Sequence, residues 1–116
     1  MTSPEQIIRV LSAGRFSLAR EKETQAEIAE AFDRFAIVHA REQDLGNRNI
    51  IDFLIGSIGL EIKIGGSKRA IFGQCVRYCK SGKLAALILG TNVAIGFPPE
   101  IVGIPCYVVS LGRAWL

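Results

Sequence analysis

Three charged residues interrupt an otherwise apolar stretch near the middle of the chain. Residues 50–64 read IIDFLIGSIGLEIKI, and their charged side chains are Asp52, Glu61 and Lys63. Two carboxylates supply the hard oxygen ligands that Mg²⁺ or Mn²⁺ prefers, and a neighbouring lysine can orient a water or a phosphate. The alternative is a surface ion pair between Lys63 and one of the acids, on an exposed face of a sheet.

The apolar stretch reads as two strands, over residues 50–55 and 58–64, joined by Gly56 and Ser57. Gly at the first turn position suits a type II′ hairpin, which pairs residue 52 with residue 61. A four-residue turn over residues 56–59 would pair residue 52 with residue 63 instead. Both registers put the two acids and the lysine on one face, because side chains alternate along a strand. Paired carboxylates have Cβ atoms about 5 Å apart and repel each other, so a bound cation would stabilise them.

Two helices flank these strands in the sequence. Residues 21–35 carry an apolar stripe at helical spacing, and residues 68–80 follow a capping Ser67 and precede Gly82. Weaker patterns predict a helix that starts at Pro4 and covers residues 6–11, and strands over residues 36–42, 84–89 and 107–109. This order predicts a single α/β domain over residues 1–116, with a mixed central sheet flanked by helices.

The positive charge of the chain is concentrated in one segment. The formal net charge is +3, from 14 Lys and Arg residues and 11 Asp and Glu residues. Six of the basic residues but only one acidic residue lie between Glu61 and Lys83. A basic segment in an otherwise near-neutral protein favours a polyanionic partner such as nucleic acid.

The cysteines and the hydropathy pattern exclude other classes of protein. Cys75, Cys79 and Cys106 are too few for a disulfide framework. Cys75 and Cys79 could form half of a zinc site, but no second pair at ligand spacing completes it, so packing is the favoured role. Residues 1–20 lack a secretory signal and no apolar run is long enough to cross a bilayer, so we expect a cytoplasmic protein without a membrane partner.

The spacing of the three charged residues is similar to a known family motif. Asp52, followed after eight residues by Glu-Ile-Lys at positions 61–63, resembles the signature of the PD-(D/E)XK nuclease superfamily. The stretch looks most like the small phage-type, VRR-NUC-like or Holliday-junction-resolvase-like members. The chain departs from the pattern at Ile51, where Pro often precedes the Asp.

Two further features carry the same resemblance. Gln74 and Tyr78 match the Gln-x-x-x-Tyr motif of several branches of the family. The expected order of helix, strand, strand, strand, helix and strand matches the family's restriction-endonuclease-like core. The resemblance covers about residues 21–90.

The resemblance implies a Mg²⁺- or Mn²⁺-dependent deoxyribonuclease that hydrolyses phosphodiester bonds. Asp52, Glu61 and the main-chain carbonyl of Ile62 would hold the metal. Family placement points to Glu23, on the preceding helix, as a further ligand. Glu27 lies nearer the apolar stripe of that helix and is the alternative.

The remaining site residues follow from the same resemblance and from charge. Lys63 would position the attacking water or stabilise charge that develops on phosphorus. Gln74 could reach that water or a phosphate. Contacts to the nucleic-acid backbone are expected from five residues of the helix over 68–80 and from Lys83 after it; the five are Lys68, Arg69, Arg77, Tyr78 and Lys80.

The size of the chain bears on its substrate. A small domain without an added recognition domain favours reading of DNA structure over long base sequences, so the expected function is a structure-specific endonuclease acting on branched DNA. The alternatives are an exonuclease and a non-catalytic nucleic-acid-binding module of the same fold. The phage-type resemblance is compatible with a phage- or mobile-element-encoded protein.

The C-terminal third predicts a homodimer. Residues 84–116 contain two charged residues, Glu100 and Arg113, among many apolar ones. An apolar patch that includes Ile101, Val102, Ile104 and Trp115 would be large for a small monomer. A two-fold axis would bury it and present two active sites to two strands. The alternative is that this segment covers the apolar face of its own sheet.

Overall fold

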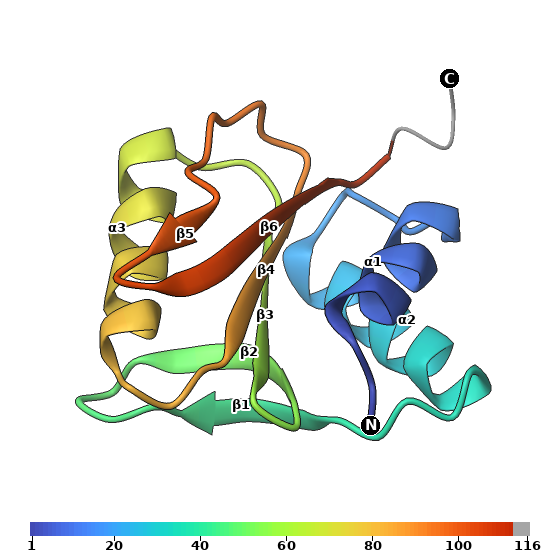
Figure 1. The fold of residues 1–116 in the computed structure, drawn as a ribbon. Helices are drawn as coiled ribbons and strands as arrows, with labels where there is room; N and C mark the ends of the chain where they lie inside the picture. The colour runs from blue at the N-terminus through green and yellow to red at the C-terminus, as the bar shows by residue number, and fades with distance from the viewer. Residues whose placement is uncertain (113–116) are drawn as a thin grey trace.

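The computed structural model describes residues 1–112 of the chain, and Arg113 and Trp115 lie outside this part. Figure 1 shows a sheet with α1 and α2 together on one side and α3 on the other. The elements in chain order are α1 (Pro4–Ala13), α2 (Glu21–Arg34), β1 (Ala40–Asp44), β2 (Ile50–Ile55), β3 (Ile58–Lys63), α3 (Lys68–Lys80), β4 (Ala86–Thr91), β5 (Glu100–Ile101) and β6 (Ile104–Ser110). The predicted α/β class is confirmed.

The sheet is mixed and its strands lie in the order β1-β2-β3-β4-β6-β5. The first three strands are antiparallel neighbours, whereas β3, β4 and β6 run parallel to one another. Helix α3 makes the crossover from β3 to β4, as a parallel connection requires. The carboxyl ends of β3 and β4 therefore lie side by side at the same end of the strands, beside the start of α3.

Each face of the sheet has its own apolar core. On the α1 and α2 side, Ile28 and Phe32 pack against the strand residues Leu60, Ile62 and Ile88, and all five are fully buried. On the α3 side, a second core contains Ile71, Leu87 and Leu89 together with Cys75, Cys79 and Cys106. The three cysteines are free and buried, which agrees with the packing role.

The hairpin that carries the two acids forms in the two-residue register. Ile55 pairs with Ile58, Leu54 with Gly59 and Phe53 with Leu60. Gly56 has a φ of 61°, a left-handed conformation that costs glycine little. The wider turn over residues 56–59 is excluded by this pairing.

The prediction of a strand over residues 36–42 is wrong in its position, because the chain first has to end α2. The N–H of Ala36 donates to the carbonyl of Asp33, and the N–H of Ile37 donates to the carbonyl of Phe32. These two bonds form a Schellman motif, with Ala36 at a φ of 55° where glycine is usual. Ile37 then packs in the same core as Phe32. Its apolar side chain therefore belongs to the end of α2 and not to the start of a strand.

The C-terminal strands also differ in extent from the prediction. Strand β4 is displaced by two residues from the expected range of 84–89, and the expected strand over 107–109 is the middle of the longer β6. Strand β5 was not predicted, since two residues carry no periodic signal. Val102 and Gly103 have positive φ values and turn the chain from β5 into β6. Within residues 1–112, no helix is both long enough and apolar enough to cross a membrane.

Candidate metal and phosphate site

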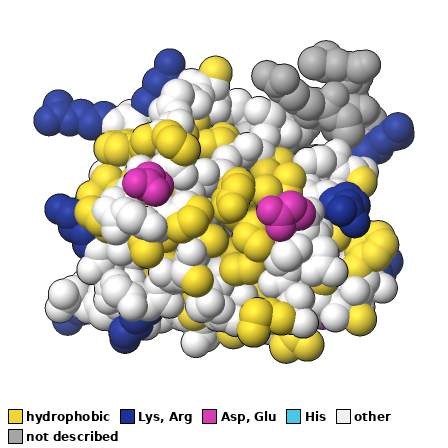
Figure 2. All heavy atoms as spheres, in the orientation of Figure 1, with side chains coloured by type: hydrophobic (Ala, Val, Ile, Leu, Met, Phe, Trp, Pro, Cys, Tyr) yellow, Lys and Arg dark blue, Asp and Glu magenta, His cyan; other side chains and the backbone are white. Residues whose placement is uncertain are grey.

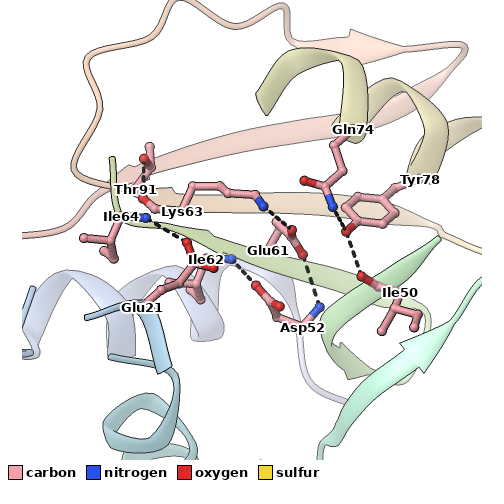
Figure 3. A network of polar contacts seen from close by, with 10 residues as sticks. All are labelled: Glu21, Ile50, Asp52, Glu61, Ile62, Lys63, Ile64, Gln74, Tyr78 and Thr91. Atoms are coloured by element: carbon pink, nitrogen blue, oxygen red, sulfur yellow. Dashed lines mark hydrogen bonds and ion pairs between the residues drawn. The ribbon is translucent and has the colours of Figure 1, made fainter. Parts of the chain in front are cut away.

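Strands β2 and β3 separate at Asp52 and Glu61, and their carboxylates take the place of ladder bonds. The last regular pair is Phe53 with Leu60. Beyond it, Glu61 Oε1 accepts the N–H of Asp52 at 3.2 Å, and Asp52 Oδ2 accepts the N–H of Ile62 at 2.7 Å. Figure 3 shows the two acids facing each other across this gap. The structure thus brings together the two acids that the register placed opposite each other.

Strict alternation fails at Asp52, although the prediction of a shared face rested on it. Ile51 packs in the core on the α3 side, whereas Phe53 packs in the core on the α1 and α2 side. Two residues of one regular strand separated by two positions would face the same way. Opposite this point, Glu42 of β1 has a φ of 51°. Asp52 therefore lies at a local irregularity and reaches Glu61 from the splayed strand.

Burial makes both acids reluctant to ionise. The side chain of Glu61 is 2% exposed, and burial together with the nearby Asp52 carboxylate raises its pKa from 4.5 to about 7. Burial also raises the pKa of Asp52, and Glu21 raises it further, against the lowering effect of the Ile62 N–H. The metal-free site therefore holds more protons at pH 6 than two exposed carboxyls would.

We expect the metal-free protein to lose stability as the pH rises from about 4.5 to about 7. The folded chain binds more protons than the unfolded chain in this window, so the free energy of unfolding falls with rising pH. For Glu61 the change amounts to about 3 kcal/mol. Urea unfolding in EDTA across this range measures it, and Glu61→Gln should flatten the curve. A wild-type curve that rises with pH would contradict the burial of this carboxyl.

Lys63 lies beside the acids at the end of β3. Its Nζ is 3.2 Å from Glu61 Oε2, and its side chain is 23% exposed, so the ammonium group still reaches solvent. Thr91, at the end of β4, donates to the carbonyl of Lys63 at 2.6 Å, and Asn92 accepts the N–H of Gly65 at 2.8 Å. These two residues hold the chain at the end of β3 and immediately after it. Sequence reasoning missed them, although a polar pair directly after a buried strand was visible.

Helix α3 places Gln74 and Tyr78 over the same part of the sheet. Gln74 Nε2 donates to the Tyr78 hydroxyl at 2.7 Å, and that hydroxyl donates to the carbonyl of Ile50 at 2.8 Å. Tyr78 is fully buried, and burial and the neighbouring Glu61 raise its pKa above the usual range. Gln74 therefore borders the site, whereas the position of Tyr78 suits support of β2 rather than contact with a nucleic acid.

The carboxylate of α2 that approaches the site is Glu21. Its Oε1 accepts the N–H of Ile64 at 3.1 Å, and Figure 3 shows it on the Asp52 side of β3. Glu23 is half exposed and lies 3.9 Å from Arg20, and Glu27 accepts the N–H of Ser17 at 2.9 Å. The structure thus brings neither expected helix acid to Asp52. Glu21, Gln25 and Ile28 lie on one helix face, so extending the apolar stripe backwards would have found it.

The expected basic residues divide between the two ends of α3. Lys68 and Arg69 are exposed in its first turn, after Ser67, whose hydroxyl accepts the N–H of Ala70 at 3.1 Å. Arg77 and Lys80 are exposed in its last turn. They border a groove that also includes Lys83 and the loop between β1 and β2.

The donor set of the site fits a hard divalent cation. Asp52 and Glu61 offer carboxylate oxygens, and the main-chain carbonyl of Ile62 lies between Glu61 and Lys63 in the chain. Within residues 1–112, no group of three His, Cys, Asp or Glu side chains surrounds one point. Mg²⁺ needs no such cage, since it keeps several waters and commonly binds through one or two carboxylates. A cation would also relieve the repulsion that raises the pKa of Glu61.

Comparisons with protein-family models, curated proteins and solved structures give no match for this chain. The function must therefore be inferred from the chemistry of the site and the fold that positions it.

Proposed function

We propose that this protein is a Mg²⁺- or Mn²⁺-dependent nuclease that hydrolyses phosphodiester bonds in DNA. The observation that carries the proposal is the buried pair of Asp52 and Glu61 with Lys63 beside it. Two acids are held next to each other at a break in the sheet, and burial raises the pKa of Glu61, which is a departure from local folding rules typical of a functional site. The element order from α2 to β4 supports a restriction-endonuclease-like core.

The residues of the chain divide the work of hydrolysis among them. Asp52, Glu61 and the Ile62 carbonyl would hold the cation, which when bound polarises a phosphate oxygen and lowers the pKa of a water. The exposed part of the Lys63 side chain lets its ammonium group donate to a phosphate oxygen beside Glu61. Gln74 would orient a water or a phosphate on the α3 side, where its Nε2 donates to the Tyr78 hydroxyl. Glu21 replaces Glu23 as our candidate for the helix carboxylate.

Nicking of a supercoiled plasmid tests the proposal most directly. We expect conversion to the open circle with Mg²⁺ or Mn²⁺ and none in excess EDTA. Comparison of a four-way junction with a linear duplex of the same sequence then tests the preference for branched DNA, and end-labelled substrates separate an endonuclease from an exonuclease. DNA binding without cleavage under any metal would favour the non-catalytic module.

Glu21→Gln should lower the cleavage rate, whereas the matched change Glu23→Gln should not. The Glu21 carboxylate lies within electrostatic reach of Asp52, and Glu23 points to solvent. Residues that orient metal ligands typically contribute about 10- to 100-fold. Steady-state rates at several Mg²⁺ concentrations measure the effect, because a loss that excess metal rescues identifies weaker metal binding. Equal cleavage rates for the two variants would show that Glu21 does not contribute to the site.

Homodimer formation stays a prediction, but the apolar patch that would form the interface contains other residues than expected. Figure 2 shows apolar side chains gathered over the face that carries β5 and β6, and Val102 and Val108 are 62% and 37% exposed. Ile101 is buried in the core of its own chain and Ile104 packs against it, so the patch is smaller than expected. Sedimentation equilibrium at micromolar concentration distinguishes one chain from two.

A further inference from the structure

A basic groove lies between the β1–β2 loop and the end of α3. It has a volume of about 560 Å³, and its polar lining residues are Asn47, Asn49, Arg77, Lys80, Ser81 and Lys83. No aromatic or acidic side chain lines it. The groove therefore offers cations and amides, which are groups that bind phosphate oxygens, whereas the Ser81 hydroxyl donates to the carbonyl of Tyr78 at 2.7 Å.

The cations of this groove have no counter-ion in the part of the chain that the structure describes. The salt bridges among residues 1–112 are Arg20–Glu23, Lys22–Glu42 and Lys63–Glu61. The acid next to the loop, Asp44, accepts the N–H of Gly46 at 2.8 Å. The helix dipole can favour Arg77 and Lys80 in the last turn of α3, but it does not account for Lys83 or for the loop. An anion would relieve the repulsion among these cations.

The loop carries another cation, Arg48, between the lining residues Asn47 and Asn49, and its backbone has an unfavourable conformation. Asn47 and Arg48 have φ values of 53° and 61°, and the N–H of Asn49 donates to the carbonyl of Gly46 at 3.0 Å. Such turns favour Asn followed by Gly. Arginine at the second position is strained, and glycine would remove that strain. The strained residue instead adds an exposed positive charge to the loop, between Asn47 and Asn49 in the chain.

The groove is connected to the site by a short path. Asn49 is three residues before Asp52, so β2 spans about 10 Å between them, or roughly three nucleotide steps along a duplex. Tyr78, next to Arg77, donates to the carbonyl of Ile50. Helix α3 and the start of β2 therefore hold the groove in a defined position relative to the two acids.

We propose that this groove binds backbone phosphates of the nucleic acid a few nucleotides away from the cleaved bond. The inference rests on the proposed function, because the nucleic acid that is cleaved at the site would also occupy the groove. The groove has no aromatic surface for a base, so its contacts position the strand without reading its sequence. A free nucleotide offers the same phosphate chemistry and is distinguished below.

Fluorescence anisotropy with a short labelled duplex in EDTA tests the proposal without requiring cleavage. The double variant Lys80→Ala/Lys83→Ala should bind at least about 10-fold more weakly, and its logarithmic salt slope between about 50 and 200 mM should be smaller by about 2. The matched control Arg9→Ala/Arg34→Ala removes the same charge from α1 and α2, on the other side of the sheet, and should keep the wild-type slope. Equal slopes for the two double variants would overturn the proposal.

Arg48→Gly provides a second readout that loss of folding cannot mimic. Relief of the left-handed strain should raise the Tm by about 4 °C, while loss of the guanidinium weakens DNA binding by about threefold. Wild-type DNA affinity in this variant would contradict a role for the loop.

Calorimetry with ATP distinguishes binding of a free nucleotide from binding of the DNA backbone. ATP binding that the Lys80/Lys83 change abolishes, with unchanged DNA binding, would make the groove a nucleotide site and overturn the proposal.

The groove and the nuclease activity can fail separately. If Lys80→Ala/Lys83→Ala nicks plasmid at the wild-type rate, at both low and high salt, the groove does not bind the substrate, and the proposed nuclease activity still stands. Salt-dependent DNA binding through the groove, without metal-dependent nicking, would support the groove and remove the nuclease.

Discussion

Asp52→Asn and Glu61→Gln are each expected to abolish metal-dependent cleavage while the protein stays folded. Each change removes one of the two carboxylates that face each other between β2 and β3. We expect a rate loss of at least about 1,000-fold, which corresponds to about 4 kcal/mol of lost transition-state stabilisation. Plasmid nicking in Mg²⁺ measures the loss, with Asp33→Asn, an exposed acid on α2, as the matched control.

Stability measurements separate this loss of activity from a loss of folding. Both amides can still accept the main-chain N–H groups of Ile62 and Asp52, and removal of one charge relieves the repulsion that raises the pKa of Glu61. The Tm in EDTA should therefore be unchanged or higher in both variants. Added Mg²⁺ should raise the Tm of the wild type but not that of either variant, because a ligand that binds the folded state stabilises it. Cleavage by either variant at the rate of Asp33→Asn would remove the paired acids from the mechanism.

Lys63→Met should slow the chemical step by about 100- to 1,000-fold and change DNA binding by less than about threefold. The ammonium group is the cation closest to the two acids, 3.2 Å from Glu61 Oε2, so its expected role is in the transition state. Single-turnover rates and anisotropy measure the two effects separately. Lys68→Met, in the exposed first turn of α3, should instead weaken binding and flatten its salt dependence.

The same substitution has a consequence for the metal-free protein. Lys63 lowers the pKa of Glu61, so its removal should raise that pKa further and extend the loss of stability to higher pH. A loss of stability that continues to higher pH, together with slow cleavage, identifies one ammonium group that acts on the ionisation of Glu61 and on the reaction. Cleavage at the wild-type rate would show that Lys63 serves only as the ion-pair partner of Glu61.

Local patterns in the sequence determined the hairpin and α3. A two-residue turn with Gly56 admits one register, and that register places residue 61 opposite residue 52. The bounds predicted for α3 are those observed, since Ser67 supplies a side-chain cap at its start. The sequence also allowed a four-residue turn over residues 56–59, which the strand pairing excludes, whereas the bounds of α3 depend on residues that are neighbours in the chain.

Tertiary structure decided which other groups join the two acids. Asp52 leaves the regular alternation where β2 separates from β3. Glu21 comes near it because α2 packs on the face of the sheet where Glu21 accepts the N–H of Ile64. Thr91 reaches the end of β3 because β4 pairs with β3 in parallel, and α3 forms the long connection between the two strands. The sequence contains these side chains, but their distances depend on how separate elements pack. The local order of apolar and polar residues does not specify that packing, so the sequence predicted Glu23, whereas the structure brings Glu21 to the end of β3.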